Sequence, residues 1–349
     1  MSPSSKHAPT PELTAAAKRL YRAEGELEYF AGGHKWSDGT VYQFARQGEA
    51  YLLKLIRAEE PGKIEVMAER LRYQEYLGQA GIDIVYPIHS ESGNLIESLN
   101  LDEPHAVFAW RKVEGEHIQL VDPTALAGFY HAWGGLVGRI HRLAQAYPDW
   151  QHSRAVDADG VPLLSRDREW DVFYNWIPDP GVKEAWLDMK ARLDTLPSDR
   201  NNFGFIHNDP HPGNILVNGQ RLTLLDFDVA NFMWFVTDLA ICIYSEYSRC
   251  RFHSGFQHRV PQLPELFLKP WLSGYLEQNQ LPAEEFQRLE LFLNYRRFLM
   301  FTVFYEQIRD GDPDYLERFT QDILAGRRYL DFEITDLIQE LPKAGQFSI

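Results

Sequence analysis

Two short apolar runs on either side of an Asn-Gly pair constrain this chain more than any other feature of its sequence. The runs are residues 215–217 and 222–225, within "FIHNDPHPGNILVNGQRLTLLDFDVA" at residues 205–230. Asn-Gly between two apolar runs is a strong signal for a β-hairpin. An antiparallel pairing brings Asn214 and Asp226, which flank the runs, to the same end of the hairpin. The sequence therefore predicts an amide and a carboxylate side by side at that end.

Asp209 lies five positions before Asn214, in a loop that two prolines stiffen by fixing φ. Amide and carboxylate oxygens are hard ligands of the kind that Mg²⁺ takes together with substrate phosphates. A further carboxylate that accepts the proton of an attacking hydroxyl completes what phosphoryl transfer requires. The order His-x-Asp, then Asn, then Asp after a strand is that of a kinase catalytic loop, except that "DFD" replaces "DFG". We therefore predict Asn214 and Asp226 as metal ligands and Asp209 as the base.

A phosphoryl-transfer site also needs a cation for the nucleotide phosphates. Lys54 stands between leucines in "YLLKLI", a predicted core strand, where a buried ammonium group needs a partner charge. The following helix offers Glu65 and Glu69, four residues apart on one face. We favour Glu69 and keep Glu65 as the alternative. A turn, "GGHKWSDG", is predicted to cover the phosphates with backbone N–H groups, through Gly32, Gly33 and Gly39.

The strand and helix signals change character along the chain. Before residue 115 they predict a small α+β part, with helices over 11–21 and 63–79 and strands within 26–57, 83–90 and 105–113. After it the pattern becomes helical, beginning with a long helix over 125–147. Gly134 and Gly135 either weaken that helix or allow another element to approach it closely.

These signals predict an α+β fold of two lobes: a small lobe with an antiparallel sheet and one key helix, and a larger lobe made mostly of helices. We expect a nucleotide-binding lobe at 1–109, a hinge at 110–115, and a mostly helical catalytic and substrate-binding lobe at 116–349. The aromatic-rich segment 170–176 and the loop 153–166 are expected to form part of the substrate surface.

Composition narrows the class of partner. The 349 residues include 35 Lys and Arg against 50 Asp and Glu, a net charge of −15 that argues against an extended nucleic-acid-binding face. Two cysteines, no signal-peptide pattern and no apolar run near the roughly 20 residues that span a bilayer predict a cytoplasmic protein without a membrane segment.

These residues resemble the family of aminoglycoside phosphotransferases, choline kinases and homoserine kinases, which has a protein-kinase-like fold. The resemblance covers most of the chain in order. Its motifs are "GTVYQF", "AYLLKL", "HAVFAWRKVEG", "LVGRIHRLA", "HNDPHPGNIL", "LLDFDVA" and "WFVTDLA". In detail the pattern is loosely similar to stress-response kinase A and its spore-coat relatives. Asn208 stands where many members have Gly, and no effect of this difference is expected.

The resemblance implies a role for each matching residue. Asp209 orients or deprotonates the acceptor hydroxyl, Asn214 and Asp226 bind Mg²⁺, and Lys54 holds the ATP phosphates. The hinge presents backbone groups to adenine at Trp110, Arg111 and Val113. Further residues are placed next to the site or facing substrate: His207, His211, Asp228 and Asp238.

The resemblance implies an ATP- and Mg²⁺-dependent kinase that phosphorylates a hydroxyl of a small molecule. An amino sugar, an amino alcohol or another amine-bearing compound fits the acidic composition. Two alternatives stay open: a protein Ser/Thr kinase of the stress-response type, and a pseudokinase that only binds nucleotide. The sequence decides neither between ATP and GTP nor between a monomer and a homodimer.

Overall fold

The structure is a computed structural model that describes residues 9–33, 39–101, 103–119 and 122–341. The backbone divides into two compact units. Unit 1 contains the described residues of Met1–Glu116 together with Ser153–Leu163 and Leu216–Asp228. Unit 2 contains the described residues of His117–His152, Leu164–Ile215 and Val229–Ile349. Two later segments thus fold with the N-terminal part, and a hinge at 110–115 stays a prediction.

Unit 1 is built on an antiparallel sheet, as the sequence predicted. The strand order is β1-β2-β3-β6-β4, and β5 also pairs with β6. The strands are β1 (Glu24–Gly32), β2 (Thr40–Arg46), β3 (Glu49–Arg57), β4 (Pro87–Ile88), β5 (Glu97–Asn100) and β6 (Pro104–Arg111). The sequence did not predict β5, because "ESLN" is short and mostly polar.

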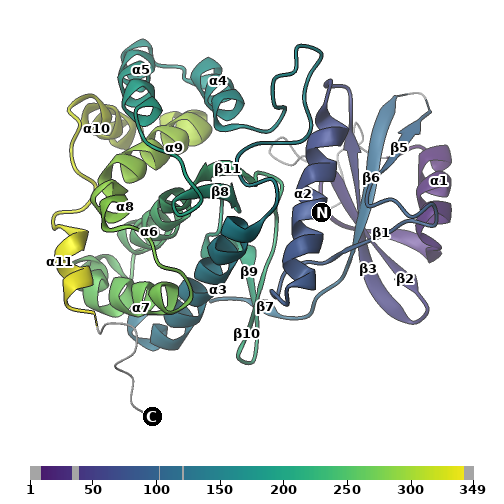
Figure 1. The fold of residues 1–349 in the computed structure, drawn as a ribbon, viewed down its shortest axis with the longest axis horizontal. Coiled ribbons are helices and arrows are strands. Elements are labelled where there is room, and N and C mark those ends of the chain that lie inside the picture. The colour runs from purple at the N-terminus through teal and green to yellow at the C-terminus, as the bar shows by residue number, and fades with distance from the viewer. Residues whose placement is uncertain (1–8, 34–38, 102, 120–121, 342–349) are drawn as a thin grey trace. The chain divides into compact units, whose positions relative to one another are not determined.

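Helices α1 (Pro11–Tyr21) and α2 (Lys63–Gln79) lie on opposite faces of this sheet (Figure 1). Successive side chains of a strand point to opposite faces. Leu53 and Leu55 of β3 accordingly pack in a cluster with residues of α1, whereas Ile56 packs with Met67 of α2. Lys54 shares its face of β3 with Ile56, which places the lysine on the α2 side of the sheet.

Helices make up most of unit 2, so the predicted α+β fold with a helical C-terminal part is confirmed (Figure 1). The α-helices are α3 (Ala127–Ala146), α4 (Arg166–Trp176), α5 (Pro180–Asp194), α6 (Phe235–Phe252), α7 (Lys269–Gln278), α8 (Ala283–Gln287), α9 (Leu289–Gly311), α10 (Pro313–Leu324) and α11 (Ile334–Gln339). Short helical turns are η1 (Pro123–Ala125), η2 (Pro212–Asn214), η3 (Gln257–Gln262) and η4 (Pro264–Leu268).

The paired glycines of α3 allow close helix packing rather than weakening the helix. A Cβ atom at Gly134 would lie 1.9 Å from the carbonyl oxygen of Trp271 in α7. In return, a Cβ atom at Gly274 of α7 would lie 2.0 Å from the carbonyl oxygen of His131. Only glycine fits at such crossings, because the obstacle on each side is backbone.

Part of the expected substrate surface is core instead. The aromatic segment 170–176 lies in α4, where Trp170 is only 1% exposed. Its ring stacks on Trp234 and meets Trp186 edge-on. The prediction that Trp170 faces substrate was wrong, because an aromatic run at helical spacing served to pack α4 against its neighbours. Trp176, at the end of the same helix, is exposed.

Four short strands adjoin the segments that carry predicted site residues. β8 (Phe203–Ile206) pairs antiparallel with β11 (Asn231–Trp234), and every residue of both is buried. The predicted hairpin is present as β9 (Ile215–Asn218) and β10 (Arg221–Leu224), joined by a two-residue turn in which Gly219 has φ +61°. β9 also pairs with β7 (Glu116–His117).

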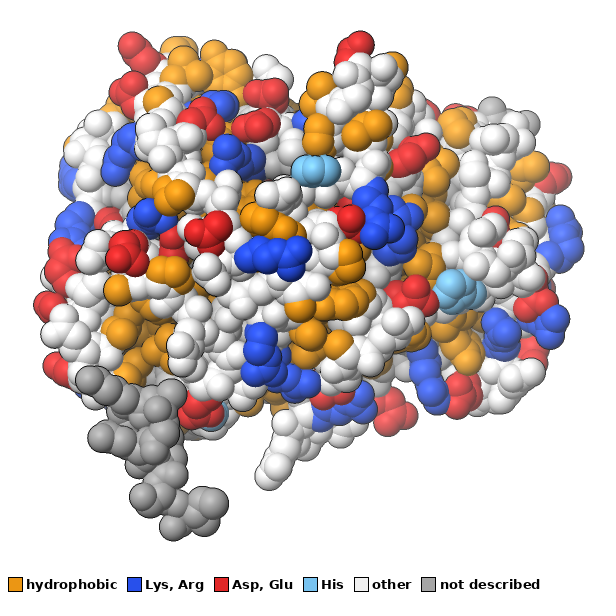
Figure 2. Space-filling model, viewed as in Figure 1, with side chains coloured by type: hydrophobic (Ala, Val, Ile, Leu, Met, Phe, Trp, Pro, Cys, Tyr) orange, Lys and Arg blue, Asp and Glu red, His pale blue; other side chains and the backbone are white. Residues whose placement is uncertain are grey.

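On the face shown in Figure 2, Lys and Arg side chains are interspersed with Asp, Glu and hydrophobic side chains. Within the described ranges, none of the helices combines the length and the hydrophobicity that crossing a bilayer requires.

Candidate active site

The loop that carries Asp209 starts from the buried strand β8 and ends in η2. Its second residue, Asn208, has φ +65°, a left-handed conformation that Asn adopts more readily than most residues. The backbone N–H of Asp209 donates to Nδ1 of His207 at 3.2 Å. His207 is itself fully buried. The loop therefore turns sharply as soon as it leaves the strand.

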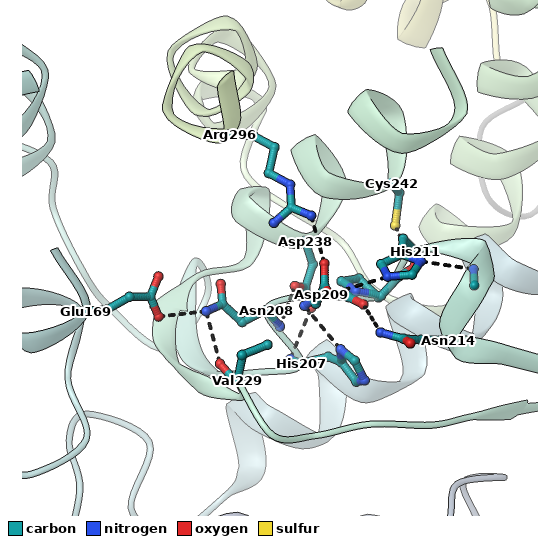
Figure 3. Close-up of polar contacts among 12 residues, drawn as sticks. Glu169, His207, Asn208, Asp209, His211, Asn214, Val229, Asp238, Cys242 and Arg296 are labelled. Carbon is teal, nitrogen blue, oxygen red and sulfur yellow. Dashed lines mark hydrogen bonds and ion pairs between the residues drawn. The ribbon is translucent and has the colours of Figure 1, made fainter. Parts of the chain in front are cut away.

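A buried carboxylate holds this turn. Asp238, in the first turn of α6, accepts the backbone N–H groups of His207 at 3.2 Å and Asn208 at 2.8 Å (Figure 3). Its Oδ2 also lies 3.1 Å from Nε2 of His141, whose Nδ1 is 2.8 Å from the hydroxyl of Tyr275. The histidine of "LVGRIHRLA" and the aspartate of "WFVTDLA" thus act together on the backbone of the loop.

The side chain of Asn208 adds a second anchor. Its Nδ2 donates to Glu169 Oε2 at 2.8 Å and to the carbonyl oxygen of Val229 at 3.1 Å (Figure 3). Glu169 also accepts from Asn231 Nδ2 and from the hydroxyl of Tyr295, each at 2.8 Å. Glycine at position 208 could adopt the same φ but could make neither side-chain bond. Asn208 therefore contributes two contacts that a glycine at this position would lack.

Asp209 projects from the turn between a buried arginine and a histidine. Nη2 of Arg296, on α9, donates to Oδ1 at 2.8 Å, and Nε2 of His211 lies 3.4 Å from Oδ2 (Figure 3). Burial raises the pKa of Asp209, but Arg296, His211 and His207 outweigh it and hold that pKa well below its usual range. Asp209 is therefore an ionised carboxylate, which is the form that a general base needs.

The rest of the loop is fixed through its backbone. The carbonyl oxygen of Pro210 accepts from Nε1 of Trp133 at 2.9 Å and lies 3.5 Å from Sγ of Cys242. Asn214 closes the loop, because its Nδ2 donates to the carbonyl oxygen of Asp209 at 3.0 Å. The amide nitrogen is thereby used inside the loop, and the amide oxygen is the atom that can bind a metal.

The predicted partner of Lys54 was wrong. In unit 1 the ammonium group of Lys54, which is only 7% exposed, forms its ion pair with Asp228. Glu69 is buried as expected, but its carboxylate accepts from the hydroxyl of Ser153 and from the N–H of Arg154 at 2.9 Å. Glu65, the alternative, is exposed. The buried ammonium group thus pairs with a carboxylate 174 positions away, and Glu69 is occupied by the segment 153–163.

Asp226 follows the hairpin in a strained conformation. Its φ is +56°, and it is one of four non-glycine residues with positive φ in the described chain. Its Oδ1 accepts the N–H of Asp228 at 3.2 Å. A left-handed conformation at a non-glycine residue costs free energy, so it persists only where the surrounding structure enforces it. Such residues concentrate at functional sites. Asp226 also remains exposed, so its carboxylate faces solvent.

The glycine turn is described only at its ends, because residues 34–38 lie outside the described ranges. Gly32, Gly33 and Gly39 all have positive φ. The N–H of Gly33 donates to the carbonyl oxygen of Gly39 at 2.8 Å, and a Cβ atom at Gly39 would lie 2.2 Å from the carbonyl oxygen of Leu55. The two ends of the turn are therefore hydrogen-bonded to each other, and Gly39 packs so closely on the backbone of β3 that a residue with a Cβ atom would not fit there.

The predicted adenine-binding segment continues β6. Trp110 and Arg111 pair with β3, and Nε1 of Trp110 donates to Oε1 of Gln74 at 3.0 Å. The N–H of Arg111 donates to the carbonyl oxygen of Tyr86, and that of Lys112 to the carbonyl oxygen of Ala50. Val113 is the second residue after the strand ends. The side chains of Trp110 and Arg111 thus stabilise unit 1, Arg111 through an ion pair with Glu49.

Residues 32–284 match the model of the phosphotransferase enzyme family. This match includes every predicted site residue and well over half of the chain. The chain belongs to the phosphotransferase enzyme family. The resemblance inferred from the motifs is confirmed, and so is the prediction of a phosphotransferase with a hydroxyl acceptor.

Known relatives of this phosphotransferase agree in fold. Amicoumacin kinase of Bacillus subtilis (strain 168) is 23% identical over 344 residues, covering 93% of this chain and 95% of that protein. The structure of an amicoumacin kinase in complex with AMP-PNP, Ca²⁺ and Ami aligns with a TM-score of 0.79 at 19% identity, covering 95% and 98% of the two chains. A microcompartment-associated aminopropanol kinase aligns with a TM-score of 0.59 at 19% identity, covering 90% and 94%. These alignments confirm the kinase-like fold.

Each predicted metal ligand of this phosphotransferase is an oxygen donor of the kind that a divalent cation accepts together with phosphates. Asn214 and Asp226 offer one amide and one carboxylate oxygen, the hard ligands that Mg²⁺ accepts in small number beside substrate phosphates and water. Within the described residues there is no group of three or more His, Cys, Asp and Glu side chains that could hold a metal alone.

Sequence reasoning missed two contacts to the loop that carries Asp209. Arg296 and Glu169 reach this loop from helices that are distant in sequence. Arg296 left one signal: it stands with Arg297 inside the apolar run "FLNYRRFLMF", where buried charges need partners. The sequence contains no comparable signal for Glu169, because "RDREW" has the composition of an ordinary exposed helix start.

Proposed function

We propose that this enzyme is a small-molecule kinase that transfers the γ-phosphoryl group of ATP to a hydroxyl group. The observation that carries the proposal is the ionised carboxylate of Asp209, held at a fixed loop in a chain of the phosphotransferase family. Its burial, its ion pair and the bonded backbone beneath it are what a base requires in order to meet a hydroxyl in one orientation.

The residue roles follow from the local contacts. Asp209 accepts the acceptor's hydroxyl proton as the oxygen–phosphorus bond forms, the bond from the γ-phosphorus to the bridging oxygen breaks, and ADP leaves. Asn214 and Asp226 would hold the cation, which neutralises charge on the phosphates when it is bound. Lys54 would bind the phosphates from the α2 side of its sheet. Asp228 orients Lys54 through their ion pair, a role that we had expected of Glu69.

The glycine turn and the segment after β6 complete the nucleotide site in this proposal. Gly32, Gly33 and Gly39 would lay backbone N–H groups over the phosphates, and residues 110–113 would face adenine. ATP and Mg²⁺ are supported as cofactors by the relative solved with AMP-PNP and Ca²⁺.

The acceptor that we propose is a small amine-bearing alcohol, with amicoumacin as the first compound to test. A relative that is similar over nearly the whole chain is an amicoumacin kinase, and a second structural neighbour is an aminopropanol kinase. No observation favours a protein acceptor or a binding-only role, since Lys54, Asp209, Asn214 and Asp226 are all present. The cytoplasmic location and the oligomeric state stay predictions.

The test is acceptor-dependent ADP release by the purified full-length chain with ATP and Mg²⁺. The panel contains amicoumacin, aminopropanol, choline and an aminoglycoside, and mass spectrometry identifies the phosphorylated product. Asp209→Ala is compared with the control Asp310→Ala. Asp310 is exposed and forms an ion pair with Arg309. We expect Asp209→Ala to lower kcat by about 10²–10⁴-fold with AMP-PNP binding retained. Turnover near the wild-type value in Asp209→Ala would refute the assignment.

A further inference from the structure

Arg296 is an unusual neighbour for a catalytic base. It lies in the apolar middle of α9, and its side chain is only 11% exposed. One of its nitrogens, Nη2, donates to Oδ1 of Asp209, while Nε is buried without a hydrogen-bond partner among the described residues. A buried guanidinium group is costly unless it is paired, so the ion pair with Asp209 is the contact that stabilises its charge.

The residue before Arg296 ties α9 to the same loop. Tyr295 donates its hydroxyl to Glu169, which also holds the side chain of Asn208. Consecutive helical residues point in different directions, and Arg297 turns away from Asp209. It donates to the carbonyl oxygen of Arg327 at 2.7 Å and to Oδ1 of Asn294 at 3.0 Å, neither of which contacts the loop.

The two oxygens of Asp209 are held unequally. Oδ1 is paired with the buried Arg296, whereas the neighbour of Oδ2 is His211, whose side chain is 34% exposed and 3.4 Å away. Nδ1 of His211 accepts the N–H of Gly213 at 3.0 Å. A neutral ring bonded in this way carries its proton on Nε2, which faces Oδ2. The contact at Oδ2 is thus longer than the one at Oδ1 and made by a more exposed side chain.

We propose that Arg296 is the positioning residue of the catalytic base: it keeps Oδ1 of Asp209 throughout the reaction, and Oδ2 is the oxygen that receives the acceptor's proton. This inference rests on the proposed function. The incoming hydroxyl displaces the exposed ring of His211 rather than the buried guanidinium group. Arg296 also offsets the repulsion between the Asp209 carboxylate and the phosphate oxygens as the acceptor attacks.

The test compares Arg296 with its neighbour Arg297, which is somewhat more buried on the same helix but pairs with Asp322 at 3.5 Å instead of with Asp209. Arg296→Met is expected to lower kcat by about 10²-fold, with little change in the KM for acceptor or in AMP-PNP binding, because it misplaces the base. Arg296→Lys keeps the charge but loses the planar guanidinium geometry, so its kcat should fall between Met and wild type. Arg297→Met should lower the melting temperature at least as much and leave kcat near the wild-type value.

A rescue experiment separates positioning from general stability. Dilute guanidinium should restore part of the kcat of Arg296→Ala and none of any loss in Arg297→Ala. His211→Ala should lose less kcat than Arg296→Met. If Arg296→Met fails to fold, Arg296→Lys and the rescue decide the question.

Two outcomes overturn the inference: wild-type kcat in Arg296→Met or Arg296→Lys, or equal losses of kcat in the Arg296 and Arg297 variants. Asp209→Ala distinguishes this failure from failure of the proposed function. If Asp209→Ala is inactive while Arg296→Met is fully active, only the positioning role is wrong. If Asp209→Ala is active, the proposed base itself is wrong.

Discussion

Replacing Asp238 should destabilise the protein far more than replacing a surface aspartate. In the wild type its carboxylate is fully buried and faces three donors: the N–H groups of His207 and Asn208, and Nε2 of His141. All three partners are buried as well. In Asp238→Ala these donors lose their acceptor inside the core.

The magnitude follows from counting the donors. An orphaned buried donor costs about 1–3 kcal/mol, so three of them predict a loss of at least about 3 kcal/mol in the free energy of unfolding. Asp238→Asn keeps one oxygen. If the amide oxygen takes the place of Oδ2, it still accepts from His141 and from the N–H of His207. The NH₂ group then takes the place of Oδ1, and the N–H of Asn208 has no acceptor. One orphaned donor predicts a loss of about 1–3 kcal/mol for Asn.

Urea denaturation followed by tryptophan fluorescence measures this loss, because Trp133, Trp170 and Trp234 are buried in the same unit. The control is Asp310→Ala, which removes an exposed ion pair and should cost no more than about 1 kcal/mol. A result in which Asp238→Ala and Asp310→Ala have the same midpoint would refute the reasoning. A larger loss of unfolding free energy in Asp238→Asn than in Asp238→Ala would refute it as well.

Three further predictions use other parts of the molecule. Gly134→Ala places a Cβ atom 1.9 Å from a backbone carbonyl oxygen and should destabilise the protein by about 1–3 kcal/mol or more. Gly128→Ala in the same helix meets open space, so it should be neutral or stabilise the protein by up to about 1 kcal/mol. Equal melting temperatures of the two variants would contradict the packing argument. Lys54→Met should weaken AMP-PNP binding and lower kcat. If the ion pair between Asp228 and Lys54 orients the lysine, Asp228→Asn should change both quantities in the same direction. Calorimetry measures the binding, and steady-state kinetics measure kcat. Chelation of divalent cations by EDTA should abolish ADP release, and Mg²⁺ added in excess should restore it; turnover that persists in EDTA would argue against a metal-dependent reaction.

Much of the fold was readable from local signals. Thr10 before Pro11 is an N-cap signal for the helix predicted over 11–21, and the hydroxyl of Thr10 accepts the N–H of Leu13 at 3.2 Å. Asn-Gly predicted the turn of the β9–β10 hairpin, which is present. These signals are reliable because a cap or a tight turn depends on residues within about one helical turn of each other. The same reasoning failed at Trp170, since helical spacing alone does not say whether an aromatic face is covered.

For the proposed site, sequence reasoning named candidate reactive groups but not the partners that the structure gives them. The spacing of Asp209 and Asn214 followed from chemistry that requires both within one loop. The partner of Lys54 could not be found in this way, because a buried ammonium group pairs with whichever carboxylate the fold brings near, and Asp228 is 174 positions away. Glu69 was a reasonable expectation on helix geometry, but Ser153 and Arg154 occupy it.

By itself, the sequence determined the class of enzyme and the chemistry of its loop, since short-range spacing decides which side chains share a turn. The tertiary structure alone decided how the base is held. Arg296, Asp238 and Glu169 come from three helices, and only the packing of those helices brings their charges to one loop. The physical reason is that the strength of an ion pair or a buried hydrogen bond depends on distance and burial in space, and separation along the chain specifies neither.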